Sequence, residues 1–212
     1  MSLSRLRVDR GANFVATQMP GDGIMDQTQV LAITTVGSGT LTAAAMDSGI
    51  VDRSGPVGAY ADVLETADNL MAANPQFSPG DSFEFWFRNT VAFANTIAVA
   101  EGAELSGANT AVAASKVRRF LVTILANARR QAYNATTTNA SPTVTGLTAA
   151  QAQTLMPGMG VSGTGISAST NVLAVNASTG VVTLTANATA SGTVPLTFFP
   201  RYNIKGLSSA DL

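Results

Sequence analysis

The side chains of this chain that could carry out chemistry are few, and their types limit the reactions available. The chain has no His, which removes the commonest general base and the commonest metal ligand. It has no Cys either, so disulfides are excluded. Hydrolysis by paired carboxylates would have to use acids near expected strand ends and turns, namely Asp81, Glu84, Glu101 and Glu104. No readable spacing pairs these acids, and solvated acids are common in turns.

Nucleophilic and cofactor-binding motifs are no better supported. A serine nucleophile would need Lys116 or Lys205 as its base, and neither lysine has a partner serine in a recognisable motif. Residues 158–163 match G-x-G-x-x-G, but a dinucleotide site also needs a preceding strand, a following helix and an acid about 20 residues later. A short helix is expected before this segment, and no acid follows until Asp211. We therefore expect turn glycines there, and predict no catalytic residue, no cofactor, no metal and no enzymatic activity.

Composition and charge exclude several classes of partner. The 212 residues carry 12 basic and 13 acidic groups, so the formal net charge of -1 gives no basic field for nucleic acid or anionic lipid. No window approaches the roughly 18 consecutive apolar residues that span a membrane. The first ten residues lack the apolar run of a signal peptide. We therefore expect a protein made in the cytoplasm that binds neither nucleic acid nor membrane.

The second half of the chain is unusual because residues 131–200 contain no Asp, Glu, Lys, Arg or His. Neutral polar residues alternate with aliphatic ones, as in Val181–Thr185, which predicts strands. We expect a small antiparallel β-module over 134–200, with a linker over 135–140 and a capping box at Thr148 and Gln151. Natural sheets blunt their edges with charges, and this module has none. Its edges and one face are therefore expected to be covered by copies of itself or by another protein.

The first half predicts a larger β-domain over 27–133 with one amphipathic helix over 59–74. Strands at 29–35 and 40–45 are expected to form a hairpin around a glycine loop. Apolar residues from Tyr60 to Met71 recur at helical spacing, and Asn74 before a proline is expected to end the helix. The overall fold class is therefore mainly β: an antiparallel, jelly-roll-like β-sandwich with one helix, joined to the small β-module. Residues 201–212 regain charge and are expected to pack on the first domain.

Candidate interface residues come from three places. Residues 1–26 are expected to form an extended arm, either mobile or lying on a neighbour. The strand that begins after Asp81 alternates Phe with polar residues and places Trp86 on its outer face, where another subunit could cover it. The doublet at 129–130 is either a solvated strand end or a group that pairs with acids of a partner. The full set is Arg5, Leu6, Arg7, Val8, Arg10, Trp86, Arg129 and Arg130.

Two stretches resemble modules of virus particle proteins. Residues 80–90, with 96–102, 105–107 and 116–120, resemble a β-module that recurs in particle proteins of tailed phages and some large viruses. Residues 158–166 and 179–185 are similar to a small repeat-like module of phage decoration, fibre and tail proteins. The resemblance implies a non-enzymatic capsid cement or decoration protein on the virion surface, often a homotrimer, whose partners are the major capsid protein and itself. The alternative is a tail or head fibre, or a host-attachment module whose neutral surface meets a glycan.

Overall fold

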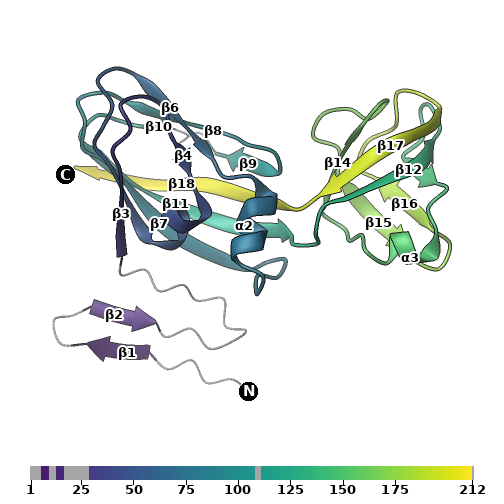
Figure 1. Cartoon of the computed structure of the whole chain (residues 1–212), viewed down its shortest axis with the longest axis horizontal. Coiled ribbons are helices and arrows are strands. Elements are labelled where there is room, and N and C mark those ends of the chain that lie inside the picture. The colour runs from purple at the N-terminus through teal and green to yellow at the C-terminus, as the bar shows by residue number, and fades with distance from the viewer. Residues whose placement is uncertain (1–5, 10–12, 17–28, 108–110, 212) are drawn as a thin grey trace. The chain divides into compact units, whose positions relative to one another are not determined.

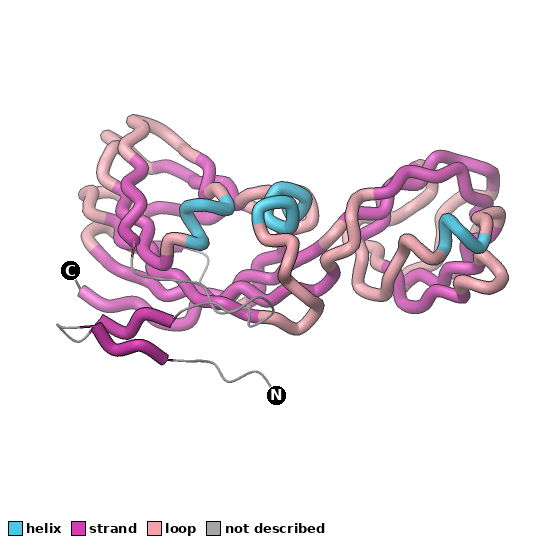
Figure 2. The backbone as a smooth tube through the Cα atoms, turned by 60° about the horizontal axis from the view of Figure 1, so that its bottom comes forward, coloured by secondary structure: helices cyan, strands magenta, loops and turns pink. Residues whose placement is uncertain are grey.

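The computed structural model describes residues 6–9, 13–16, 29–107 and 111–211, with side chains described for 29–107 and 111–207. By internal contacts the chain divides into two compact units. Unit 1 consists of residues Met1–Ile124 and Tyr202–Leu212, and unit 2 of Leu125–Arg201. Strands are the main regular structure of both units, and the three helices among the described residues are short (Figure 2). The predicted mainly-β fold is confirmed.

Unit 1 is a sandwich of two sheets (Figure 1). The larger sheet has the order β3 (Gln29–Ile33), β5 (Gly49–Arg53), β7 (Ser82–Asn89), β11 (Lys116–Ala126), β18 (Arg201–Asp211), β9 (Ala103–Ser106). The smaller sheet has the order β10 (Ala111–Val112), β8 (Asn95–Ala98), β6 (Tyr60–Leu64), β4 (Thr40–Leu41). Side chains from both sheets meet in one apolar cluster between them.

From β3 to β11, each strand of unit 1 lies in the other sheet from the strand before it. A strand that returns to its own sheet after one such excursion can run in the same direction as before. Accordingly β5 is parallel to β3 and β7, and β6 is parallel to β4 and β8. Strand directions in the sandwich are therefore mixed. The expected hairpin of 29–35 with 40–45 is wrong, because these segments belong to different sheets and residues 43–47 are helical.

The expected helix over 59–74 is also wrong in its first half. Residues 60–64 form β6, in which Tyr60, Asp62 and Leu64 are buried alternately, and only residues 67–73 form the helix α2 (Ala67–Ala73). The Thr66 side chain accepts a hydrogen bond from Asn69 N and so begins this helix. Helix α1 (Ala43–Asp47) begins in the same way at Thr42. In the sequence, the apolar residues of β6 recur at period 2 and those of α2 at period 3.6. Read together, they resemble one helical stripe.

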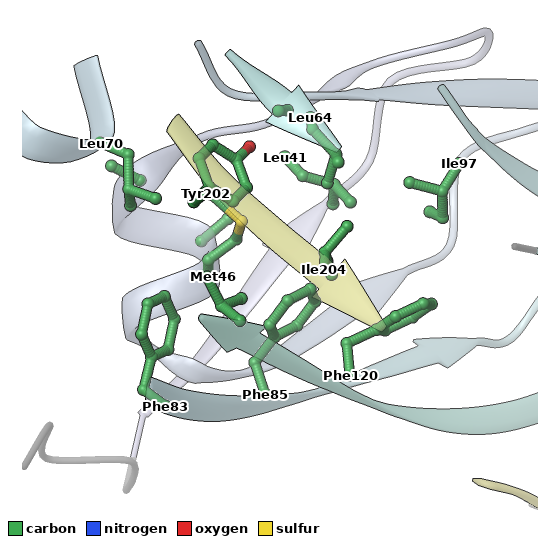
Figure 3. Packing of buried hydrophobic residues seen from close by; sticks show 14 of the residues in the cluster. Leu41, Met46, Leu64, Leu70, Phe83, Phe85, Ile97, Phe120, Tyr202 and Ile204 are labelled. Carbon is green, nitrogen blue, oxygen red and sulfur yellow. The ribbon is translucent and has the colours of Figure 1, made fainter. Parts of the chain in front are cut away.

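The core of unit 1 is built on the aromatic face of β7. Phe83, Phe85 and Phe87 are buried, as their alternation predicts, and the ring of Phe85 stacks on Phe120 of β11 at 5.3 Å between centroids. Figure 3 shows the rings of Phe83, Phe85 and Phe120 below Tyr202 and Ile204 of β18. Leu41, Leu64 and Ile97 of the smaller sheet lie on the opposite side. The segment expected to pack on the first domain thus forms a strand within its larger sheet, between β11 and β9.

Unit 2 lies in the sequence between β11 and β18, which are neighbours in the larger sheet and run in opposite directions (Figure 1). Its own six-stranded sheet has the order β14 (Gly160–Gly163), β17 (Gly192–Phe199), β12 (Gln131–Thr137), β13 (Thr143–Thr145), β16 (Val181–Leu184), β15 (Val172–Asn176). The predicted capping box is confirmed at α3 (Ala149–Ala152). The expected linker over 135–140 is partly wrong, because β12 continues to Thr137 and buries that residue.

The sheet of unit 2 closes on itself. Its two outer strands, β14 and β15, meet at a bridge between Gly160 and Asn171. Backbone hydrogen bonds on either side, from Gly158 N to Val172 O (2.8 Å) and from Val161 N to Thr170 O (2.9 Å), continue the join. The sheet is therefore a small barrel, closed at residues 158–161 and 170–172, where its two outer strands cover each other's edges. The absence of charge in unit 2 does not by itself require covering by another subunit.

The described part of the N-terminal segment is a separate two-stranded sheet. Strand β1 (Leu6–Asp9) pairs antiparallel with β2 (Asn13–Ala16), with Leu6 opposite Ala16 and Asp9 opposite Asn13. The sequence predicted an extended arm over 1–26, of which these two strands are the part that the structure describes. Arg5 and Arg10 lie outside the described residues.

Candidate interaction surface

The outer face of the larger sheet of unit 1 carries the one Trp of the chain. Because side chains alternate along β7, the residues between its buried phenylalanines point outward, away from the core. Trp86 is 37% exposed there, as the sequence predicted for an outer-face residue. A partly exposed tryptophan is a common centre of protein interfaces, since it buries a large area with few rotatable bonds.

Strand register places two aliphatic side chains beside Trp86. Ile50 of β5 is its partner on one side, and Val30 of β3 is the partner of Ile50. Registered residues share a face, so Val30, Ile50 and Trp86 form an apolar line across three parallel strands, here called the Trp86 row. Val30 is 55% exposed and Ile50 is half-buried. The row is a continuous apolar strip, and Val117 and Leu121 of β11 lie on the same face.

Ion pairs flank the Trp86 row. On β11, Arg119 lies opposite Trp86, with its guanidinium 5.7 Å from the ring centroid and 3.3 Å from Glu84 Oε2. On the side toward the other end of β7, Arg88 donates to both carboxylate oxygens of Asp52, and this hydrogen bonding raises the pKa of Arg88. The charges therefore cancel in pairs, and the arrangement of an apolar centre with a polar rim is typical of protein–protein interfaces.

A second polar group, centred on Arg53, is buried between the two sheets. Arg53 of β5 and Asp62 of β6 are both fully buried, and Arg53 Nε donates to Asp62 Oδ2 at 2.9 Å. The remaining donors of Arg53 bind Asp62 Oδ1 and the carbonyls of Ile33, Thr35 and Gly37, so all five are used. This network fixes the loop after β3 and joins the sheets.

The neighbours of the Arg53 network are also bound internally. Asp62 accepts from Gly39 N at 2.7 Å and from Asn95 Nδ2 at 2.8 Å. Burial raises the pKa of Tyr60 to about 12, so its hydroxyl keeps its proton and donates to Asn89 Oδ1 at 2.9 Å. The charged groups are thus enclosed and hydrogen-bonded to the protein, while Asn95 Oδ1 is buried without a partner. The role of the network is structural, and sequence analysis missed it because its members lie on two sheets.

The acids considered for hydrolysis do not gather into a site. Asp81 accepts from Ser78 N at 2.8 Å within a turn, and Glu84 is paired with Arg119. Across the described ranges, no group of three or more acidic residues is placed to hold a metal ion. The absence of enzymatic activity stays a prediction.

The glycine-rich segment has a packing role. Residues 160–163 form strand β14 and open no helix, so the fold context of a dinucleotide site is missing. A Cβ at Gly160 would lie 2.1 Å from the Phe199 ring, which explains why only glycine fits there. Turn glycines were expected here, but Gly160 and Gly163 lie in a strand and only Gly158 lies in a turn.

The predicted interface residues belong to different parts of the chain. Trp86 lies on the face just described, whereas Arg129 and Arg130 are exposed residues of unit 2, with Arg130 5.5 Å from the Phe199 ring centroid. Leu6, Arg7 and Val8 belong to β1, where only the backbone is described. Val30 and Ile50 were missed, because nothing in their sequence shows that β3, β5 and β7 are adjacent and parallel.

Comparison with protein-family models, with curated proteins and with solved structures found no match to this chain. Among the described residues, no helix has the length and apolar character needed to cross a membrane. The function is therefore inferred from the geometry of the chain itself.

Proposed function

We propose that this protein is a non-enzymatic capsid cement protein, which binds the outside of a virus head and staples neighbouring capsid subunits. The observation that carries the proposal is the Trp86 row on the outer face of the larger sheet. In this proposal, unit 1 docks on the major capsid protein through that face, and the protein acts on the virion surface after synthesis in the host cytoplasm. A homotrimer, as the sequence resemblance implies, would present three such faces at once.

The chemistry of the row supports docking on protein. Binding that removes an exposed Trp and two aliphatic residues from water is favourable, by roughly 25 cal/mol per Å² of apolar surface buried. Each flanking ion pair is neutral as a whole and adds little long-range attraction. The pairs would therefore act mainly by fixing the position in which the partner docks. A stapling protein needs only to bind the assembled shell more tightly than its separate subunits in order to stabilise it.

Unit 2 supports the proposal less strongly than its composition suggested. Its closed barrel satisfies its own edges, so its neutral surface is free to project from the particle. We assign the anchoring to unit 1 for this reason.

The test compares two variants that remove equally exposed aromatic rings. Trp86→Ala deletes the aromatic member of the row, whereas Phe93→Ala deletes a ring of unit 1 that is 38% exposed and lies outside the row. Co-sedimentation with capsids that lack the protein should show a loss of at least about tenfold in affinity for Trp86→Ala. Phe93→Ala should bind within about threefold of wild type. Equal binding of Trp86→Ala and wild type would contradict the assignment of this face.

A second candidate, a fibre or host-attachment module, is favoured by a line of hydroxyls on unit 2. Thr136 of β12 lies between Thr193 of β17 and Thr145 of β13 in register, and its Oγ1 is 3.0 Å from Thr193 Oγ1. Neighbouring hydroxyls can donate to and accept from sugar hydroxyls. Binding of the full chain to host-envelope glycans, weakened by Thr136→Val and unaffected by Trp86→Ala, would support this function in place of the first.

A further inference from the structure

Strand β3 is an unprotected edge of the larger sheet. Within the described part of the chain its only strand neighbour is β5, so the backbone groups on its other side have no strand partner. Its sequence, Gln-Val-Leu-Ala-Ile, contains no charge and no proline. Natural sheets avoid such edges because they pair readily with other strands.

The other edges in the described units are protected by familiar means. Strand β9, at the opposite edge of the larger sheet, carries Glu104. The outer strands of the smaller sheet, β4 and β10, are two residues long. The outer strands of unit 2 meet each other at the Gly160–Asn171 bridge. Strand β15 also has five uncharged residues, but it meets β14 at its first residue, whereas no described strand meets the outer side of β3. This difference indicates that β3 is used for pairing.

Among the described strands, the strand pair β1–β2 lacks a third strand to which its backbone groups can hydrogen-bond. It is a two-stranded sheet, and isolated two-stranded sheets are marginally stable in water. A third strand would supply backbone partners along one side of the pair. Strands β1 and β2 would therefore be stabilised by a further strand, and β3 presents a free edge.

We propose that the β1–β2 pair of one copy of this chain adds to the β3 edge of a second copy. A second copy is the donor because, within one chain, β1–β2 forms a sheet separate from that of β3. Residues 17–28 join the two elements, and twelve residues of extended chain reach at most about 40 Å, enough to cross to a neighbouring molecule. Each copy then gives one strand pair and receives one, either reciprocally in a two-fold dimer or head to tail in a ring. This inference stands independently of the capsid role.

The absence of Cys makes cross-linking a direct test. Val15→Cys in β2 and Ala32→Cys in β3 are made in separate proteins that carry different tags, then mixed and treated with a short bifunctional maleimide. The proposal expects a cross-linked heterodimer from this mixture. It expects little product when Ala32→Cys is replaced by Val57→Cys, an exposed position outside β3. A double variant, Val15→Cys with Ala32→Cys, that cross-links only within single chains would overturn exchange between copies.

A charge on the edge supplies the second test. Val30→Lys places an ammonium group on β3 at a position that is 55% exposed, and Val57→Lys makes the same change at a position that is 75% exposed. Sedimentation equilibrium should show self-association weakened by at least about tenfold for Val30→Lys and unchanged for Val57→Lys. Circular dichroism checks that both variants fold. Wild-type protein that stays monomeric, or Val30→Lys protein that associates like wild type, would overturn the proposal.

Discussion

At the scale of single residues, the two Arg–Asp pairs of unit 1 show how burial decides what an ion pair contributes. Arg53 and Asp62 are both fully buried, and Asp62 also accepts from Gly39 N and Asn95. Arg88 and Asp52 form a similar pair on the outer face, with side chains 42% and 21% exposed. Removing one partner of the buried pair leaves a charge without compensation, whereas the exposed pair is hydrated in either case.

The first prediction follows from this contrast. Asp62→Ala is expected to lower the free energy of unfolding by about 3–5 kcal/mol, because Arg53 would keep its charge in the core. Asp52→Ala, the matched control, is expected to cost less than about 1 kcal/mol. Urea denaturation of both variants measures the difference. Similar losses in the two variants would show that the Arg53 network does not hold the sheets together.

Asp47 gives a prediction on pH. Its Oδ2 accepts from Asn74 Nδ2 at 2.8 Å, but its Oδ1 is buried without a partner, and burial raises the pKa of this carboxyl above the ordinary 3.8. A raised pKa in the folded state means that the protonated form is favoured by folding. Protonated Asp47 therefore contributes to the stability of the folded state. This contribution is complete below pH 3.8 and is lost as the pH rises through the folded-state pKa. Ionised Asp47 therefore destabilises the protein at pH 7.

Asp47→Asn is accordingly expected to raise the melting temperature at pH 7. The gain should shrink as the pH falls toward 3.8, because Asp47 is then protonated in wild type as well. Thermal melts of both proteins between pH 3.5 and 7 test this, at about half-unit steps. A gain that is the same at every pH would mean that it has another cause than ionisation.

At the scale of elements, the sequence predicted those strands whose pattern is complete within one segment. The alternation in β7 correctly predicted that three phenylalanines are buried and that Trp86 lies on the outer face. It failed where two elements of different period follow one another, as at Tyr60 to Met71, because their apolar positions merged into one helical stripe. Thr66, which caps α2, was the local signal that the helix begins late.

Features that depend on which strands are neighbours were beyond sequence reasoning. The Trp86 row needs β3, β5 and β7 side by side and parallel, and alternation along a strand contains no information on this. The Arg53 network depends in the same way on β5 and β6 facing each other from two sheets. The sequence therefore predicted Trp86, the aromatic residue of the candidate surface, but its two aliphatic members could be found only from the structure.

The last strand, β18, gives a prediction at this scale. The Tyr202 hydroxyl donates to the Glu65 carbonyl at 2.6 Å and links the larger sheet to the start of α2, while burial raises the pKa of Tyr202. Tyr202→Phe should lower the free energy of unfolding by about 1–2 kcal/mol, because the carbonyl loses its donor in a buried place. Tyr133→Phe, which removes a hydroxyl that contacts side chains at the surface, should cost under about 0.5 kcal/mol. Equal losses would contradict a special role for the Tyr202 contact.

At the scale of the whole molecule, unit 2 is an insertion between two neighbouring strands of unit 1. Its closed barrel has its own apolar core, and the strands that lead into and out of it lie next to each other in the larger sheet. An inserted domain of this kind can be removed without breaking the sheet that holds it. The composition of residues 131–200 revealed the module, but closure of the barrel depends on sheet curvature, which the charge pattern does not report.

Replacing residues 127–199 by a short glycine-containing turn is therefore expected to leave unit 1 folded. Near-ultraviolet circular dichroism of the shortened chain should keep the aromatic signal of the core, and capsid binding should be retained. An unfolded product would mean that the two units depend on each other for stability.

The central claim is that the outer face of unit 1 around Trp86 becomes covered when the protein binds a capsid. Trp86 is the chain's single Trp, so 5-hydroxytryptophan incorporated in its place can be excited apart from the tryptophans of the capsid. Quenching by acrylamide is then measured for the free protein and for the protein bound to capsids. The proposal predicts that binding reduces the quenching constant several-fold, because the ring leaves water. Quenching that stays unchanged while the protein is bound would contradict the claim.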